Sequence, residues 1–305
     1  MKTTDIVVLT DSRYVQPDSK EDYIQNLLKE DQLVVDALEA LDYKVKRLAW
    51  DDPNFDWNST QFILFRTTWD YFDRFDEFSN WLNRVSRQTQ LLNSEAIIRW
   101  NIDKHYLLDL QEKGVNICET VFIEQGTSKS LSALAEEHNY SEFVLKPCIS
   151  GAARETYRIT SEMVGDYEEK YRQLITQEAM MLQPFQHNIV TKGEVSYMVM
   201  NGKFTHAILK IAKTGDFRVQ DDFGGTVQWY EPSQEEIDFA EFTVSCCEAS
   251  PIYARVDAFI DNSGNLALAE LELIEPELWF RFHPKAAEEL AYGIQQRIHT
   301  HEKIN

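Results

Sequence analysis

The chain has 305 residues and a formal net charge of −21 at pH 7, and a surface this negative repels polyanions, which argues against general binding of nucleic acid or of anionic membranes. With 43% hydrophobic residues, 11 Gly and 8 Pro, the composition is globular rather than disordered or fibrous. The four cysteines lack CxxC spacing, and no apolar run reaches the ~20 residues of a membrane span, which favours a cytoplasmic compartment.

The first region, residues 1–95, is expected to form a small open sheet with helices on its faces. Apolar runs and helical spacings predict, in chain order, a strand over Ile6–Thr10, a helix over Leu27–Leu41, strands over Val45–Ala49 and Phe62–Arg66, and a helix over Phe75–Val85. A βαββα order of this kind is typical of α/β units.

Two further regions are expected, over residues 96–185 and 186–305. The second should contain a helix over Asp103–Lys113 ended by Gly114, strands over Thr120–Glu124, Phe143–Pro147 and Met180–Phe185, and helices near Ser130–Asn139 and Asp166–Ile175. The third should contain strands over Val195–Met200, Lys203–Ile211, Tyr253–Ile260 and Asn265–Ile274 and a helix over Pro284–His299. Asn201-Gly202 is a strong hairpin signal between the first two of these strands. The predicted fold class is α/β or α+β.

The strand around LALAELELI carries an unusual pair of acids. Regular alternation would place Glu270 and Glu272 on the face that also carries Leu266 and Leu268. Two carboxylates about 7 Å apart on one strand face repel each other unless a cation lies between them. Asp257 on the hairpin partner would add a third oxygen donor, and such a set favours Mg²⁺, or Mn²⁺, over zinc. On spacing alone, solvent-facing glutamates on an edge strand remain an equal alternative.

Two motifs in the second region suggest contact with an anion or a base. Lys146 ends the apolar strand FVLKP, and the small residues after it, among them Ser150 and Gly151, would let backbone amides approach a phosphate. An ordinary hairpin turn explains the same residues, and neither a P-loop nor a GxGxxG fingerprint is present. The segment MLQPFQH could offer Gln183, Pro184 and Phe185 to an adenine, or form an interdomain hinge.

A cationic, glycine-bearing segment follows the strand of the third region. In LKIAKTGDFRVQDDFGGTV, Lys210, Lys213 and Arg218 alternate with glycines, a pattern suited to stabilising charge on a transferring phosphoryl group. An exposed hairpin loop is the alternative.

Taken in order over residues 93–285, these motifs resemble the ATP-grasp superfamily in its glutathione-synthetase-like branch. The resemblance implies an ATP-grasp fold with an N-terminal open-sheet domain over 1–95, a central lid subdomain over 96–185 and a C-terminal subdomain with the metal site over 186–305. It implies roles for Lys104, Lys146, Ser150 and Gly151 at the ATP phosphates, Gln183, Pro184 and Phe185 at adenine, Glu194 at the ribose, Arg218 and Lys210 in catalysis, and Asp257, Glu270 and Glu272 at Mg²⁺.

A narrower resemblance covers nearly the whole chain. RTTWDYFDRFDEFSNWL, LLNSEAIIRWNIDK and ELELIEPEL are similar to a set that includes the cyclo-ligase closing the D-cycloserine ring. Two positions depart from the commoner pattern: the loop SGAAR is poorer in glycine, and Glu272 stands where glutathione synthetases usually carry Asn.

The function that the resemblance implies is ligation through an acyl phosphate. ATP would activate the carboxylate of a small amino-acid-like or peptide substrate, an amine or similar nucleophile would attack it, and ADP and phosphate would leave. The alternatives are a cycloserine-type cyclo-ligase, a non-catalytic nucleotide-binding regulator and a phosphotransferase; a homodimer is left open.

Two arginines are candidates for binding substrate. Arg66 could hold a substrate carboxylate, although a strand-end arginine paired with Asp70 or Asp73 is favoured over that role. Arg281 could face the same pocket or be exposed. His105 is expected to be structural rather than catalytic.

Overall fold

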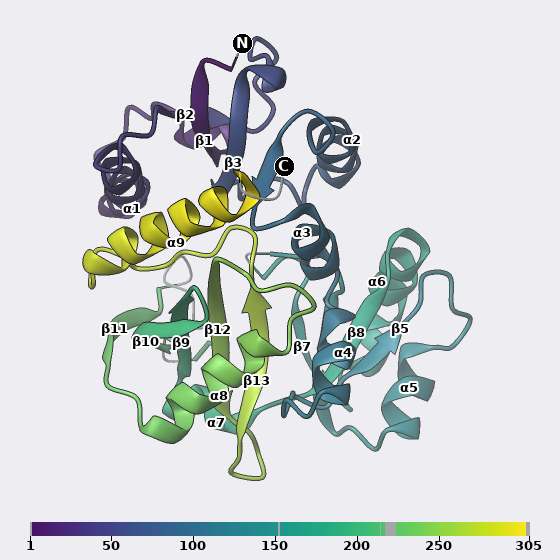
Figure 1. Ribbon diagram of the computed structural model, residues 1–305. Helices are drawn as coiled ribbons and strands as arrows, with labels where there is room; N and C mark the ends of the chain where they lie inside the picture. Colours follow the sequence, from purple (N-terminus) through teal and green to yellow (C-terminus); the bar gives the residue numbers. More distant parts are fainter. Residues whose placement is uncertain (1, 152, 214, 217–223, 303–305) are drawn as a thin grey trace.

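Three β-sheets, one in each third of the chain, form the framework of the computed structural model (Figure 1). The structure describes residues 2–151, 153–213, 215–216 and 224–302. The first sheet is parallel, in the order β2-β1-β3-β4. Its strands are β1 (Thr4–Thr10), β2 (Val45–Ala49), β3 (Thr60–Thr67) and β4 (Gln90–Leu92), with helices α1 (Asp22–Glu39) and α2 (Phe75–Val85) and short 3-10 turns at Ser12–Tyr14 and Trp57–Ser59.

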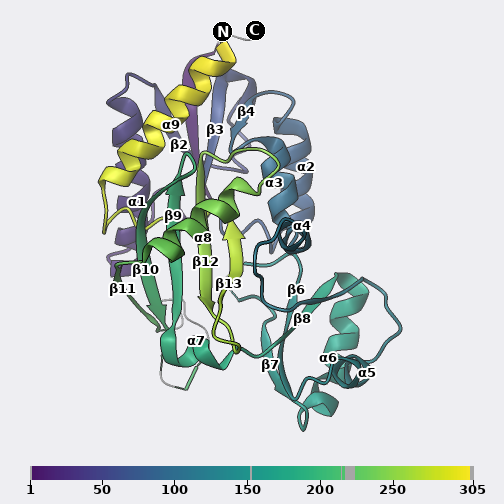
Figure 2. The same ribbon diagram turned by 60° about the horizontal axis from the view of Figure 1, so that its bottom comes forward.

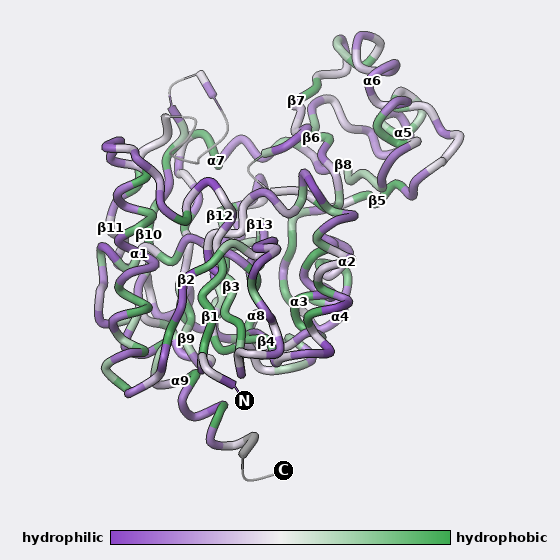
Figure 3. The backbone as a smooth tube through the Cα atoms, turned by 90° about the horizontal axis from the view of Figure 1, so that it is seen from above, coloured by the Kyte–Doolittle hydropathy of each residue, from purple (hydrophilic) through white to green (hydrophobic). Residues whose placement is uncertain are grey.

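Apolar side chains on both faces bury this first sheet. On one face, Ile6 and Val8 of β1 pack with Val34 and Leu38 of α1. On the other, residues of β1 and β3 pack with α2 and a set of aromatic rings. Figure 3 shows the hydrophobic colouring along β1 and β3 at the centre of the molecule. Parallel strands buried on both faces are expected to read as continuous apolar runs, as these do.

The second sheet is antiparallel and projects from the rest of the molecule (Figure 2). Its strands run in the order β5-β8-β6-β7 and comprise β5 (Val121–Ile123), β6 (Glu142–Pro147), β7 (Tyr157–Thr160) and β8 (Met180–Pro184). Helices α5 (Leu131–Glu137) and α6 (Val164–Gln177) pack on it through one apolar cluster.

The third sheet is antiparallel, in the order β11-β10-β9-β12-β13. Its strands are β9 (Glu194–Met200), β10 (Lys203–Ile211), β11 (Thr226–Tyr230), β12 (Tyr253–Ile260) and β13 (Leu266–Glu272), and the helices near it are α7 (His187–Lys192), α8 (Gln234–Ser245) and α9 (Lys285–Glu302). Helix α9 lies between this sheet and the first one, because its apolar residues share a core with β1, α1 and β9 (Figure 1).

Local signals in the sequence account for several boundaries. Asn201 and Gly202 both have positive φ, 52° and 76°, as the tight hairpin turn between β9 and β10 requires. Ser233 and Glu236 form a reciprocal capping box at the start of α8. This S-x-x-E signal is visible in the sequence, although helix α8 was not predicted. The elements α3, α7, β4, β7 and β11 were not predicted either.

One predicted helix was wrong in its extent. The helix expected over Asp103–Lys113 corresponds to the shorter α4 (Tyr106–Glu112), and a separate helix, α3 (Glu95–Ile102), precedes it. Asp103 is extended, with φ −104° and ψ 124°, which ends α3. The break lets the Lys104 amide donate to the Cys148 carbonyl at 3.0 Å, so that the segment between the helices is tied to the end of β6.

Candidate functional site

One cavity is lined by residues from all three regions of the chain, and it contains nearly every residue predicted for the site. The predicted residues that line it are Lys104, Lys146, Ser150, Gly151, Gln183, Pro184, Phe185, Glu194, Lys210, Asp257, Glu270 and Glu272. Arg218 lies outside the described residues. Trp69 and Tyr71, which follow β3 in the first region, line the cavity as well.

The acidic strand β13 differs from its predicted alternation by one residue. Asp257 pairs with Glu270, but the neighbouring Ala258 pairs with Leu268, so that Ala269 is an extra residue on β13. A bulge of this kind shifts every later side chain to the opposite face. Leu268 and Leu271 therefore both enter the core under α8, whereas Glu270 and Glu272 line the cavity. The prediction that the leucines share a face with the glutamates was wrong.

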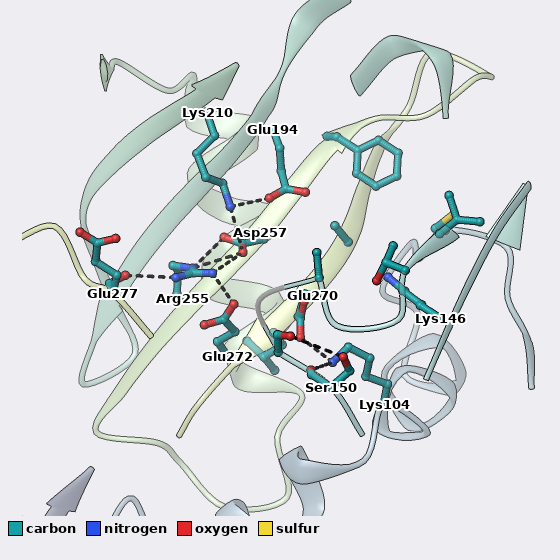
Figure 4. A pocket seen from close by; sticks show the side chains of 18 of the residues that line it. Lys104, Lys146, Ser150, Glu194, Lys210, Arg255, Asp257, Glu270, Glu272 and Glu277 are labelled. Carbon is teal, nitrogen blue, oxygen red and sulfur yellow. Dashed lines mark hydrogen bonds and ion pairs between the residues drawn. The ribbon is translucent and has the colours of Figure 1, made fainter. Parts of the chain in front are cut away.

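A guanidinium lies among the predicted metal donors (Figure 4). Arg255 donates to Asp257 from its Nη2 at 2.9 Å and forms an ion pair with Glu272, its cross-strand partner. Asp257 also accepts from Ser196 Oγ at 2.5 Å and from Lys210 Nζ at 3.2 Å. The carboxylates thus share positive partners supplied by the chain itself.

These partners move the acid pKa values in different directions. Burial alone would raise the pKa of Asp257, but the charges of Arg255 and Lys210 outweigh it and lower that pKa to about 2. For Glu272, burial prevails over Arg255 and raises the pKa to about 7. The pKa of Glu270 is lowered, because two lysines offset its burial. Glu272, whose pKa is raised, is therefore the acid whose ionisation a bound cation would favour most.

Two lysines approach the acids from the central region. Lys104 Nζ lies 2.9 Å from Glu270 Oε1 and donates to the carbonyl of Ser150 at 2.7 Å. Lys146 points into the cavity from the end of β6 (Figure 4) and forms no hydrogen bond or ion pair with any residue that the structure describes. Burial, together with the charge of Lys104, lowers the pKa of Lys146.

The phosphate-loop candidate is held against the first region. A Cβ built on Gly151 would lie 2.5 Å from Cε1 of Phe72, so that any side chain there would displace the ring. Gly151 is therefore required for close packing and not only for approach to a ligand.

The adenine candidates line the same cavity. Gln183 donates to Thr120 Oγ1 at 2.8 Å, and the guanidinium of Arg158 lies 3.8 Å from the centre of the Phe185 ring. Glu194, the ribose candidate, forms an ion pair at 2.5 Å with Lys210, which also contacts Asp257 of the acid cluster.

The two arginines predicted for substrate do not line the cavity. Arg66 is 1% exposed; it donates to the carbonyl of Pro276 at 3.0 Å, and its Nε lies 3.8 Å from Asp31. The favoured alternative, a pair with Asp70 or Asp73, was also wrong, because Asp70 pairs with Arg74. Arg281 instead forms ion pairs with Glu30 and Glu277. Arg66 thus ties the segment that follows β13 to β3, and Arg281 ties the same segment to α1.

Two further residues of the cavity, Arg255 and Glu275, were not predicted from the sequence. Arg255 stands two residues before Asp257 on β12, and this spacing places both side chains on one face of a strand. Glu275 lines the cavity beside Tyr71, and its pKa is raised to about 8 by burial and by the charge of Glu272. The first had a detectable signal in the sequence; the second lies beyond the strand, where alternation no longer applies.

Comparison with known proteins shows which proteins this chain resembles. The N-terminal domain family of the D-cycloserine synthetase DcsG matches residues 6–93. The cycloserine biosynthesis protein DcsG of Streptomyces lavendulae is 27% identical over 268 residues, which cover 82% of this chain and 87% of that protein. The crystal structure of D-cycloserine synthetase DcsG superposes with a TM-score of 0.84 and 23% identity, over 96% of this chain and 99% of that one.

Two more distant structures decide the fold. The ATP-grasp ligase PsnB complexed with a minimal precursor matches with a TM-score of 0.62 and 15% identity, over 95% of this chain and 99% of that one. The chain has the ATP-grasp fold. D-alanyl-alanine synthetase A of Vibrio cholerae matches with a TM-score of 0.66 and 14% identity, over 97% and 98% of the two chains.

The predicted ATP-grasp resemblance, and the narrower likeness to the cycloserine-forming protein, are thereby confirmed. The proteins that this ATP-grasp chain resembles are ligases and synthetases, which agrees with the predicted enzyme class. Within the described residues of the structure, no helix has the length and apolar character needed to cross a membrane.

Proposed function

We propose that this ATP-grasp protein is an ADP-forming ligase that activates a carboxylate and joins it to an amine or a similar nucleophile. The observation that carries the proposal is one cavity in which Lys104 and Lys146 face Asp257, Glu270 and Glu272. Two cations beside three acids suit a polyphosphate and its metal ion, because each group then has a partner of opposite charge.

The two lysines are proposed to hold the phosphates of ATP. Lys146 forms no ion pair with a described residue, and the nearby charge of Glu270 does not offset the cost of burying its ammonium. A phosphate would remove this cost. Lys104 already binds Glu270 and the Ser150 carbonyl, so it would bring the phosphate loop and the acid strand to the same ligand.

The acids are proposed to hold Mg²⁺, with Mn²⁺ as an alternative. The donor set fits a hard cation: Asp257 and Glu270 are cross-strand neighbours, Glu272 follows on the same face, and no His or Cys stands among the three. When bound, Mg²⁺ would neutralise charge on the β- and γ-phosphates. Arg255 competes for two of these acids, so the ion would have to displace or share its contacts.

Two cations of the third sheet are proposed to stabilise the negative charge that develops on the activated carboxylate. Arg255 and Lys210 are held in place by Asp257, and preorganised donors of this kind stabilise charge that develops in a transition state. Arg218 keeps its proposed role from the resemblance alone. The substrate would enter beside Trp69 and Tyr71, so the two arginines first considered for it are not part of this proposal.

A second candidate, ring closure within one substrate molecule, is favoured by a specific observation. The likeness to DcsG covers 82% of this chain, and the domain family that matches residues 6–93 covers the region that supplies Trp69 and Tyr71. Activation of the carboxylate would be the same; the nucleophile would belong to the same molecule.

The test is ADP release from Mg-ATP with a panel of amino acids, dipeptides and O-substituted serines, each product being identified by mass. Release of inorganic phosphate together with a dehydrated product would support a ligase. A dehydrated product formed from a single substrate, with no second substrate added, would identify ring closure. Phosphate retained on the product would identify a phosphotransferase. Tight ATP binding with no turnover across the panel would favour the regulator. We propose the cytoplasm as the compartment, in keeping with four free cysteines.

A further inference from the structure

A second group of metal-ligating side chains lies outside the ATP cavity, where α3 ends. A carboxylate oxygen of Asp103, a ring nitrogen of His105 and the sulfur of Cys148 lie within 4.8 Å of one another. The first two come from the segment between α3 and α4, and the third follows β6. The backbone bond from Lys104 to Cys148 holds these two segments together.

The contacts of His105 favour a lone pair that points toward a cation. Its Nδ1 lies 2.5 Å from Oδ1 of Asp103, and its Nε2 lies 3.3 Å from a carboxylate oxygen of Glu124. A neutral imidazole carries one proton, so one of these two nitrogens faces a carboxylate with its lone pair. When the proton is on Nε2, Glu124 accepts it, and Nδ1 and Asp103 are two acceptors that face each other within the group that includes Cys148. A metal ion would satisfy both acceptors.

The composition of the group decides which ion would fit. A thiolate, an imidazole and a carboxylate form a mixed S, N and O set that suits Zn²⁺ or Co²⁺ and not Mg²⁺. Because metal–ligand bonds are about 2.0–2.3 Å long, ligand atoms that now lie within 4.8 Å of one another would have to shift by about 1 Å to bind one ion. The Asp103 and His105 side chains are 41% and 31% exposed, so they can move and an ion can reach them, while Cys148 is buried beneath.

We propose that Asp103, His105 and Cys148 form a binding site for a zinc-class divalent cation, with Glu124 accepting the Nε2 proton of His105. The ion would bind the Cys148 sulfur as a thiolate, and the thiol proton would pass to solvent. Lys104 lies between two of the ligands, and Lys146 stands two residues before the third. The ion would therefore fix the distance between the two lysines that we propose as phosphate ligands, which makes it a structural or regulatory ion rather than a catalytic one.

The test is titration of the untagged, reduced full-length chain with Co²⁺ alone, without nucleotide. One ion per chain is expected, with the ultraviolet charge-transfer band of a cobalt thiolate. Cys148→Ser should abolish the band, and His105→Gln, at a partly exposed side chain, should weaken binding at least tenfold. Cys246→Ser, a buried cysteine in the third region, is the matched control and should bind as the native chain does. Zn²⁺ should displace the cobalt.

Two outcomes would overturn the site. The native chain would take up no cobalt at micromolar concentrations, or its band would persist in Cys148→Ser. Because no ATP is present, neither outcome bears on the proposed ligase activity.

Discussion

Arg255 and Glu272 are cross-strand partners on β12 and β13, and their ion pair lies inside the cavity where a metal ion was predicted. The same guanidinium binds Asp257. In the free protein, two of the three proposed metal donors, Asp257 and Glu272, are therefore paired with an arginine of the chain. A metal ion that binds these two acids must therefore compensate for the loss of their ion pairs with Arg255.

Replacing Arg255 with Gln should make the protein's stability depend on Mg²⁺. Removal of one partner leaves buried acids uncompensated, at a cost of about 3 kcal/mol in the free energy of unfolding. Millimolar Mg²⁺ should restore much of this loss and raise the melting temperature of the variant more than that of the native chain. Urea unfolding with and without Mg²⁺ measures both effects. Equal responses in the two proteins would mean that these acids do not hold the ion.

Replacing Glu270 with Gln should lower substrate-dependent ADP release by about 100-fold while the fold is retained. The amide keeps the shape of the side chain but removes a charge that the ion and Lys104 both need. Steady-state kinetics over a range of Mg²⁺ concentrations is the measurement, with Glu288→Gln on the exposed face of α9 as the control. Native activity in the Glu270 variant would remove this residue from the site.

Replacing Lys146 with Met should weaken ATP binding at least about tenfold without loss of stability, because the side chain has no ionic partner among the described residues to lose. Calorimetric titration with a non-hydrolysable ATP analogue and thermal unfolding test the two parts separately. Lys203→Met, at an exposed lysine of β10, should change neither. If the Lys146 variant unfolds earlier and binds ATP normally, the lysine is structural.

The stability of the protein should fall in acid through His206. This side chain is 1% exposed; its Nε2 donates to the Leu278 carbonyl at 2.9 Å, and its Nδ1 lies 2.9 Å from Thr205 Oγ1. Burial, with some effect of His283, lowers its pKa to about 4. The unfolded chain, with a histidine pKa of about 6.5, binds a proton that the folded chain does not. The contribution is therefore complete above pH 6.5 and is lost as the pH falls toward 4, by up to about 3 kcal/mol.

Denaturant unfolding at pH 7 and pH 4.5 measures this effect. His206→Gln should show a smaller decrease in unfolding free energy between the two pH values than the native chain. His187→Gln, at an exposed histidine, should follow the native chain. A decrease that is the same in all three would place the acid sensitivity elsewhere.

The sequence by itself determined the elements whose signals are local. The apolar runs of β1 and β3, the Asn201-Gly202 turn and the Gly114 helix end were predicted because each depends on neighbouring residues alone. The ordered motifs likewise located the lysines and acids of one cavity, since their order along the chain is itself the signal of the fold.

Only the tertiary structure decided which partners those residues have. The bulge at Ala269 reverses the face of every later side chain on β13, and nothing in a strictly alternating sequence reports an extra residue in a strand. Arg66 and Arg281 lie outside the predicted site because they contact Asp31 and Glu30 of α1, which are distant from them in the sequence. Long-range electrostatic partners depend on how the sheets pack, and so Arg255, not either of them, stands among the acids.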